Sequence, residues 1–512
     1  MSVPPASAND ALRMLQQGDP EGALEAGRRA LAINPGDARA HLAAGLALRF
    51  LQRHGESLAA LEQAARLDPR DYGAAFELGI ALEFAGRGRE ALESFRRAVE
   101  LRAGFLPARH ALGIGLHRAG AKAEALPHLA AAAAGAHVPT RWILDHARVL
   151  AELSQWDAAG SEYQRAATVA PQDAEAHVEL GRFCVGRADL AGAALAFEAA
   201  CRLEPQRIEW PMYLAQVELL RGRWAQGWRG YRFREQRLAF EAERARAGRP
   251  YVVPSLDGLH AGPITLVREQ GLGDELFFLR FAPRLRELGV RLAYAGNARL
   301  LPLLARTGVF DALRDIEREP PQAAEEVLLT ADLPAVVAPL QPFAPPLAIA
   351  PRDDIAAQML RSLEAAGPRP WIALTWRAGT PRALGADALS KEVPLEVLAA
   401  ALAEVPGTLV ALQRSPSAAE IDALAQATGR PVHDFSATAQ DLEQALAISK
   451  LVDRHVAVSS TNMHLAASAG ASADVLVPYP PEWRWRMEGD SPWFPGFRIH
   501  RQDRERRWRI RL

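Results

Sequence analysis

The chain has 512 residues, which is enough for about three domains. Its 60 Lys and Arg residues against 61 Asp and Glu residues leave a formal net charge of −1, which argues against nucleic acid or an anionic membrane surface as the main partner. The two cysteines, Cys184 and Cys201, provide neither a disulfide framework nor metal-ligand spacing, and this usage is typical of a reducing compartment.

The chain contains no segment that reads as a targeting or membrane-spanning sequence. Residues 1–14 lack the apolar stretch of a signal peptide. The longest apolar run, Ala335–Ala350, is broken by prolines and is too short to cross a bilayer. We therefore expect a cytoplasmic protein without stable membrane insertion.

The first half repeats with a period of 34 residues from residue 4 to about 237, in blocks that begin at 4, 38, 72, 106, 140, 174 and 208. The eighth position of each block is small: Ala11, Gly45, Gly79, Gly113, Ala147, Gly181 and Ala215. The twenty-fourth is mostly large: Gly27, Leu61, Phe95, Leu129, Tyr163, Phe197 and Tyr231. Small residues let two helices approach closely, and the large residue fills the gap between them. The array therefore predicts stacked helix pairs.

This array resembles the tetratricopeptide repeat, with Leu78-Gly79, Leu112-Gly113 and Leu180-Gly181 at the Leu-Gly pair of that family. Such arrays stack into a superhelix with a concave groove. Two interpretations stay open, because the groove either captures a protein or peptide, or the array is a spacer or oligomerisation arm. The seventh block is rich in aromatic residues, and we expect it to dock onto the next domain. Residues 238–262 lose the period and gain proline and glycine, which predicts a linker or docking segment.

The second half alternates short apolar runs with helical patterns, which predicts an α/β region of parallel sheets covered by helices. A new strand at Trp371–Trp376 indicates two half-domains, 263–368 and 369–512, with a ligand cleft between them. The first half-domain opens with a predicted strand at Ile264–Val267 and a helix from Glu275 onward. The turn between them contains Gly271, Gly273 and Asp274. Asp274 is either a helix N-cap or a carboxylate held at the cleft as a general base.

Two further stretches carry candidate anion ligands. Ser459, Ser460, Thr461 and Asn462 lie before a helix that we expect to begin near Met463. Their hydroxyls and the free N–H groups of a helix N-terminus either bind an anion or only cap the helix.

His464 lies one turn inside that helix, as a ligand contact or as a structural histidine. Arg377 and Lys391 follow Trp376, as phosphate-binding cations or as solvated charges.

The tail of the chain offers aromatic side chains, and the chain lacks metal-binding motifs. Four aromatic residues of the tail either stack on a base or sugar or seal the closing segment against the core: Trp483, Trp485, Trp493 and Phe494. The sequence has no D-x-D, no H-E-x-x-H and no metal-spaced His/Cys cluster. We therefore expect no metal and no bound cofactor.

The second half resembles the glycosyltransferases of the lipopolysaccharide heptosyltransferase type, which have the two-lobed GT-B fold. The matching segments are Glu269–Asp274 with Arg280-Phe281, Trp376, Lys391, Met463–Ala467, Pro481–Trp485 and Ser491–Pro495. The match is closest to bacterial proteins that fuse tetratricopeptide repeats to such a domain, and with the repeats it covers nearly the whole chain. The expected fold class is thus an all-α repeat superhelix (1–237) followed by an α/β two-lobed domain.

The resemblance implies that Asp274 is the base that deprotonates an acceptor hydroxyl, which then attacks the anomeric carbon of a nucleotide-activated sugar. It implies that Lys391 and the Ser459–His464 loop hold the phosphates of the donor without a metal. Gly271, Gly273 and Arg377 complete the predicted donor-binding set. In one departure, this loop has Ser459-Ser460-Thr461 where the heptosyltransferases typically have Asp-Thr-Gly.

The resulting hypothesis is a metal-independent glycosyltransferase whose donor is a nucleotide-sugar and whose acceptor is a protein or peptide presented by the repeats. Two alternatives remain. One is a repeat scaffold with a degenerate, non-catalytic transferase module. The other is a transferase that acts on a saccharide or lipid acceptor.

Overall fold

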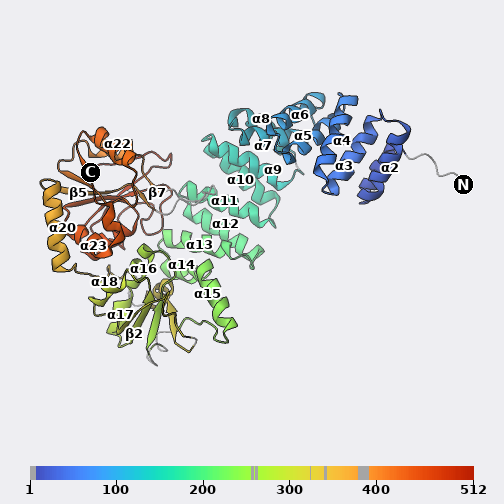
Figure 1. Cartoon of the computed structure of the whole chain (residues 1–512). Helices are drawn as coiled ribbons and strands as arrows, with labels where there is room; N and C mark the ends of the chain where they lie inside the picture. The colour runs from blue at the N-terminus through green and yellow to red at the C-terminus, as the bar shows by residue number, and fades with distance from the viewer. Residues whose placement is uncertain are drawn as a thin grey trace. The chain divides into compact units, whose positions relative to one another are not determined.

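The computed structural model describes residues 7–135, 137–254, 259, 263–322, 324–338, 343–378 and 391–512. The chain divides into two compact units, residues 1–180 and 181–512. Figure 1 shows helices alone in the first unit, and both helices and strands in the second.

The first unit is an array of helices in which consecutive helices pack against each other. Figure 1 shows them stacked in chain order. They are α1 (Ala8–Gln16), α2 (Pro20–Ile33), α3 (Ala38–Phe50), α4 (His54–Leu67), α5 (Tyr72–Phe84), α6 (Gly88–Leu101), α7 (Leu106–Arg118), α8 (Lys122–Ala133), α9 (Thr140–Glu152) and α10 (Trp156–Val169). The next helix, α11 (Ala174–Gly186), crosses the boundary between the two units.

In the four repeats with glycine at the eighth position, this position meets the large residue at the twenty-fourth position, as the sequence predicts. A Cβ added to Gly79 would lie 2.5 Å from Cδ1 of Phe95. A Cβ added to Gly113 would lie 2.6 Å from Cγ of Leu129. Since protein interiors are close-packed, the absence of a Cβ is what allows these helix pairs to form.

The second unit begins with the last repeat helices, α12 (Leu190–Leu203), α13 (Glu209–Leu220) and α14 (Trp224–Tyr231), followed by α15 (Glu235–Arg246). Helix α15 therefore occupies the first part of the segment predicted as a linker or docking segment. The indole rings of Trp228 and Trp483 meet edge to face with centroids 5.1 Å apart, and those of Trp224 and Trp493 are 5.3 Å apart. The seventh block thus docks onto the α/β part through its aromatic residues, as expected.

A buried ion-pair network joins α15 to the α/β part. Arg234, the N-cap of α15, donates through Nε and Nη2 to the two carboxylate oxygens of Glu269. Its Nη1 donates to Asp332 Oδ1 at 2.8 Å. Arg237 and the Tyr251 hydroxyl donate to the other oxygen of Asp332 at 3.0 and 2.6 Å. Every charged member of the network is paired, as buried charges require. Burial nevertheless outweighs the pairing with Arg234 at Glu269 and raises the pKa of that carboxyl.

Two parallel sheets form the α/β part. The four-stranded sheet has the order β3-β2-β1-β4 and the six-stranded sheet has the order β12-β11-β10-β5-β8-β9. Figure 1 shows β2 and β5 in these separate sheets. The strands are β1 (Ile264–Val267), β2 (Leu292–Gly296), β3 (Ala312–Asp315), β4 (Val327–Leu329), β5 (Trp371–Thr375), β8 (Thr408–Ala411), β9 (Val432–Asp434), β10 (Arg454–Val458), β11 (Asp474–Val477) and β12 (Arg498–Arg501). Strand β6 (Arg377–Ala378) pairs antiparallel with β7 (Lys391–Glu392).

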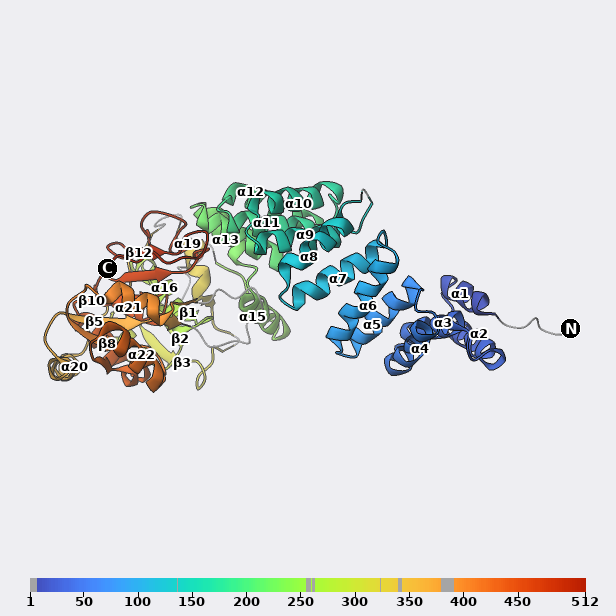
Figure 2. The same ribbon diagram turned by 90° about the horizontal axis from the view of Figure 1, so that it is seen from above.

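The six-stranded sheet is buried on both faces. Ile372 and Leu374 of β5 pack with α21 and α22, whereas Trp371 and Ala373 pack with α20 and α23. Figure 2 shows α21 and α22 beside β5 and β8. The helices of the α/β part are α16 (Leu272–Leu279), α17 (Ala282–Glu287), α18 (Leu301–Ala305), η2 (Thr330–Asp332), α19 (Leu333–Val337), α20 (Asp353–Ala366), α21 (Leu395–Leu402), α22 (Ala418–Thr428), η3 (Ser436–Gln440), α23 (Leu442–Leu451) and α24 (Thr461–Ser468).

The structure corrects two sequence-based helix starts. Helix α16 begins at Leu272 with Gly271 as its N-cap, so the interpretation of Asp274 as the N-cap is wrong. Asp274 instead lies in the first turn of the helix, where a carboxylate is stabilised by the free N–H groups. Helix α24 begins at Thr461 rather than near Met463, with Ser460 as its N-cap.

Replacing Gly79 with alanine tests the close helix approach. Phe95 is fully buried and cannot move without disturbing the core, so Gly79→Ala should lower the free energy of unfolding by about 1–3 kcal/mol. Thermal denaturation followed by circular dichroism measures the change. The matched control is Gly88→Ala in α6, where nothing lies within 4 Å of the added Cβ. An unchanged Tm for Gly79→Ala would contradict this packing.

Asp474 of β11 predicts an acid-dependent part of the stability. Burial alone would raise the pKa of Asp474 above its ordinary value of 3.8, but hydrogen bonds from His500 and Arg454 outweigh burial and lower the pKa to about 2. This interaction therefore contributes about 2 kcal/mol above pH 4 and is lost as the pH falls toward 2. In Asp474→Asn, the loss of stability between pH 4 and pH 2, measured by urea denaturation, should be smaller by that amount. In the control Asp422→Asn, at an exposed position, the pH dependence should match the wild type.

Candidate functional site

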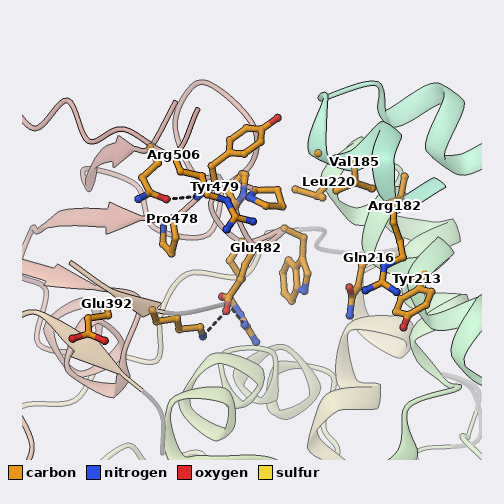
Figure 3. Close-up of a pocket in the computed structure, with 18 of the residues that line it drawn as sticks. Arg182, Val185, Tyr213, Gln216, Leu220, Glu392, Pro478, Tyr479, Glu482 and Arg506 are labelled. Carbon is orange, nitrogen blue, oxygen red and sulfur yellow. Dashed lines mark hydrogen bonds and ion pairs between the residues drawn. The ribbon is translucent and has the colours of Figure 1, made fainter. Parts of the chain in front are cut away.

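A cavity of about 1060 Å³ lies within the second unit. One wall comes from the repeat helices and includes Tyr213, Gln216 and Leu220. The opposite wall includes Lys391 of β7 and Glu482 of the segment after β11. Figure 3 shows Tyr213 and Gln216 facing Glu482 across the cavity. The turn before α16 and its first residues contribute Gln270 and Asp274.

The N-terminal ends of α16 and α24 meet beside this cavity. A Cβ added to Gly273 would lie 3.0 Å from Cδ2 of His464 and 3.4 Å from Oγ1 of Thr461. The missing Cβ of Gly273 therefore lets the two helix ends pack closely, and a Cβ there would require the buried His464 ring to shift by a few tenths of an ångström. Gly271, by contrast, faces open space, since nothing lies within 4 Å of its added Cβ.

Asp274 is held in place by Arg484. Nη2 of Arg484 donates to Oδ1 of Asp274 at 2.5 Å. About a third of the Asp274 side chain, 35%, is exposed, whereas Arg484 is 8% exposed. The guanidinium group of Arg484 also lies 4.6 Å from the ring centre of Phe277 and 4.5 Å from that of Trp483. A cation in such an aromatic cage has few alternative positions.

Glu482 connects Arg484 to Lys391. Oε1 of Glu482 forms an ion pair with Nζ of Lys391, and Oε2 lies 3.6 Å from Nη1 of Arg484 and 3.5 Å from Oγ of Ser459. Burial alone would raise the pKa of Glu482, but Lys391 and Arg484 outweigh burial and lower the pKa. Burial alone would lower the pKa of Arg484, but Asp274 and Glu482 raise it. Glu482 and Arg484 are thus both charged at neutral pH. They lie between Asp274 and Lys391 in the order Asp274, Arg484, Glu482, Lys391.

The N-terminus of α24 has unused polar atoms. Oγ of Ser460 and Nδ1 of His464 are buried and have no hydrogen-bond partner in the described part of the chain. Burial lowers the pKa of His464 well below its ordinary value, and the positive charges of Arg484, Arg280 and Lys391 add to this effect. His464 is therefore a neutral imidazole.

Two predicted donor contacts are instead occupied by structural interactions. The amide nitrogen of Asn462 donates to Thr375 Oγ1 at 3.0 Å and to the Leu412 carbonyl at 2.9 Å. Arg377 forms a bidentate ion pair with Glu420 at 3.0 and 3.1 Å. These contacts hold the ends of β5 and β8 and the start of α22, and neither residue lines the cavity.

Sequence reasoning assigned no role to Glu482 and Arg484, although both lie in the Pro481–Trp485 segment that carries the family resemblance. In sequence, both residues lie about 210 positions from Asp274 and about 90 positions from Lys391. The aromatic tail residues lie mainly in the core, with Trp485 and Trp493 fully buried. These two rings therefore seal the segment rather than stack on a ligand, while Trp483 reaches the cavity wall.

Two features are absent from the residues that the structure describes. Within them, no three His, Cys, Asp or Glu side chains cluster in a way that would hold a metal ion. None of the helices in these ranges has the length and apolar character that crossing a bilayer requires.

Comparison with known proteins identifies the repeats. A family model for the tetratricopeptide repeat matches residues 42–105 and 144–208. The chain thus contains tetratricopeptide repeats, as the sequence pattern predicts. No curated protein matches the chain.

Several solved structures of repeat proteins are similar to part of the chain. YrrB, described as a TPR protein with an unusual peptide-binding site, is 21% identical, with a TM-score of 0.34 over 36% of this chain and 96% of its own. MamA from Desulfovibrio magneticus RS-1 is 24% identical, with a TM-score of 0.31 over 33% of this chain and 96% of its own. PilF of Pseudomonas aeruginosa is 22% identical, with a TM-score of 0.36 over 41% of this chain and 95% of its own.

The two glycines of the turn before α16 give a matched test of the site geometry. Gly273→Ala should force the ends of α16 and α24 apart and lower the free energy of unfolding by about 1–3 kcal/mol. Gly271→Ala meets open space but puts alanine at the N-cap of α16, so it should lower the free energy of unfolding by less than about 1 kcal/mol. Thermal denaturation of the two variants checks the difference. Equal Tm values would contradict the close approach at Gly273.

Proposed function

We propose that the second unit is a glycosyltransferase with two GT-B-type lobes, which moves a sugar from a nucleotide-activated donor to an acceptor hydroxyl. The observation that supports this proposal is the convergence of Asp274, in the first turn of α16, and Lys391, in β7, on one cavity. Clefts that combine apolar walls with a few charged groups are the usual sites of small-molecule binding.

Asp274 has the geometry of a general base. Arg484 occupies Oδ1, and no described residue donates to Oδ2. In the proposed reaction, Oδ2 accepts the proton of the acceptor hydroxyl as the hydroxyl oxygen bonds to the anomeric carbon of the donor sugar. The bond from that carbon to the phosphate oxygen breaks, and the leaving group takes the electron pair.

The negative charge on the leaving group requires positive partners. Lys391 faces the cavity, and the free N–H groups and hydroxyls at the start of α24 lie beside it through the contact of Ser459 with Glu482. A cation together with a helix N-terminus stabilises a diphosphate without a metal ion. Of the donor-binding set expected from the sequence, Lys391 lines the cavity. The other members lie outside this lining: Gly271, Gly273, Arg377, Ser459, Ser460, Thr461, Asn462 and His464.

The acceptor is proposed to be a protein or peptide. Arg182 of α11 and Gln216 of α13 both line the cavity and are 34 residues apart, so they occupy the same position in successive repeats. A polypeptide that follows this face of the repeats would reach Asp274. Tetratricopeptide arrays offer such a concave surface.

The alternative is a protein-interaction scaffold with a non-catalytic second unit. The observation in its favour is that Asp274 and Lys391 are both already paired with protein groups. Binding of a nucleotide-sugar at these two residues would distinguish an enzyme from a scaffold.

Ligand-dependent thermal stability tests the donor site. A nucleotide or nucleotide-sugar present at a hundred times its Kd should stabilise the wild type by about 2.7 kcal/mol and raise Tm. Lys391→Met should lose most of this increase, whereas the control Lys450→Met, at an exposed position of α23, should retain it. The panel contains nucleoside mono- and diphosphates and their sugars. A folded wild type that responds to none of them would favour the scaffold.

Catalysis is tested with the donor identified in that way. Asp274→Asn keeps the shape of the side chain and should keep donor binding, but should lower the rate of transfer at least about 100-fold. The measurement is release of the nucleoside phosphate in the presence of a library of hydroxyl-bearing peptides. Transfer at the wild-type rate would contradict the role of Asp274 as the base.

A further inference from the structure

The carboxylate of Glu482 is surrounded by groups that bind anions. Nζ of Lys391 pairs with Oε1, and Oγ of Ser459 and Nη1 of Arg484 lie 3.5 and 3.6 Å from Oε2. An ammonium, a guanidinium and a hydroxyl are the donors that also bind phosphate oxygens. The Glu482 carboxylate thus lies among groups that would also suit a phosphate.

Hydrogen-bonding capacity in this cluster is left over. Nε of Arg484, on a side chain that is 8% exposed, is buried without a partner in the described residues. Oγ of Ser460, next to Ser459, is likewise buried without a partner among them. A phosphate or diphosphate has more oxygens than one carboxylate, so it can accept from more donors than Glu482 does.

Glu482 belongs to a packed segment, but its carboxylate reaches the cavity. Trp483, next to Glu482, and Trp485, three residues further on, are 6% and 0% exposed. The Glu482 side chain is 20% exposed and lines the cavity (Figure 3). Rotation of the side chain alone would therefore free Lys391 and Arg484 without unpacking the segment.

We propose that Glu482 is an internal competitor: its carboxylate occupies the phosphate site formed by Lys391, Ser459 and Arg484, and a phosphate or diphosphate ligand binds there by displacing it. The inference rests on the proposed function in one respect, because that function names a nucleoside diphosphate as the natural ligand. Inorganic pyrophosphate has the same charge chemistry and tests the site without the nucleotide.

This proposal predicts the sign of a substitution. If Glu482 only positioned Lys391, its loss would weaken anion binding. As a competitor, Glu482 opposes binding, because its own ion pairs must break first. Glu482→Gln keeps the size of the side chain, removes the charge and should bind pyrophosphate about fivefold more tightly than the wild type, as expected for the loss of a partly exposed ion pair.

The experiment is isothermal titration calorimetry of the full chain with sodium pyrophosphate at constant ionic strength. The matched control is Glu392→Gln, because Glu392 is a second carboxylate of the same cavity and is exposed. It separates the local effect from a general gain in positive charge. Adding Lys391→Met to Glu482→Gln should abolish the gain, which places the anion at the predicted site. Circular dichroism confirms that each variant is folded.

Each outcome either supports or overturns the proposed role of Glu482. Tighter binding by Glu482→Gln, without a similar gain in Glu392→Gln, supports the proposal. Weaker or unchanged binding by Glu482→Gln, an equal gain in Glu392→Gln, or no binding by any folded variant overturns it. A gain for pyrophosphate without binding of any nucleoside diphosphate would support the competitor role of Glu482 while contradicting the proposed glycosyltransferase function.

Discussion

The geometry of the cavity depends on the buried ion pairs around Asp332. Arg234 and Arg237 come from the start of α15, Glu269 follows β1, and Asp332 ends η2, so three separate segments are held by one set of paired charges. Removing one partner of such a network leaves an uncompensated buried charge, which is strongly destabilising. The residue next to Glu269 is Gln270, which already lines the cavity. The position of the candidate base is therefore coupled to the end of the helical region.

A second constraint acts at the other end of the same turn. Gly273 brings the start of α16 against the start of α24, so that the electropositive ends of two helices lie near one another. The alternating charges of Asp274, Arg484, Glu482 and Lys391 then run along one wall, and no two like charges are neighbours in that order. This arrangement concentrates charge near the cavity without leaving it unbalanced.

The sequence predicted the repeats, the parallel sheets and the strand–turn–helix at residue 264 because these features depend on local periodicity. It missed short strands such as β3 and β9, whose pairing is set by neighbours distant in sequence. In the site, the family resemblance indicated Asp274 and Lys391 as candidates, and both line the same cavity. Pattern alone did not separate Asn462 and Arg377, which hold neighbouring elements, from residues that face the cavity. Nor did it indicate Glu482, since its partners come from other segments of the chain.

The repeat wall of the cavity also decides where the chain can be shortened. Arg182, Tyr213, Gln216 and Leu220 belong to the repeat helices by sequence, yet they line the same cavity as Asp274. A fragment that starts after the last repeat would lose this wall and expose Trp483 and Phe278, which pack against Trp228. The smallest fragment that retains the whole lining must therefore include at least the last two repeats, whereas the number of repeats before them is free to differ without changing the lining.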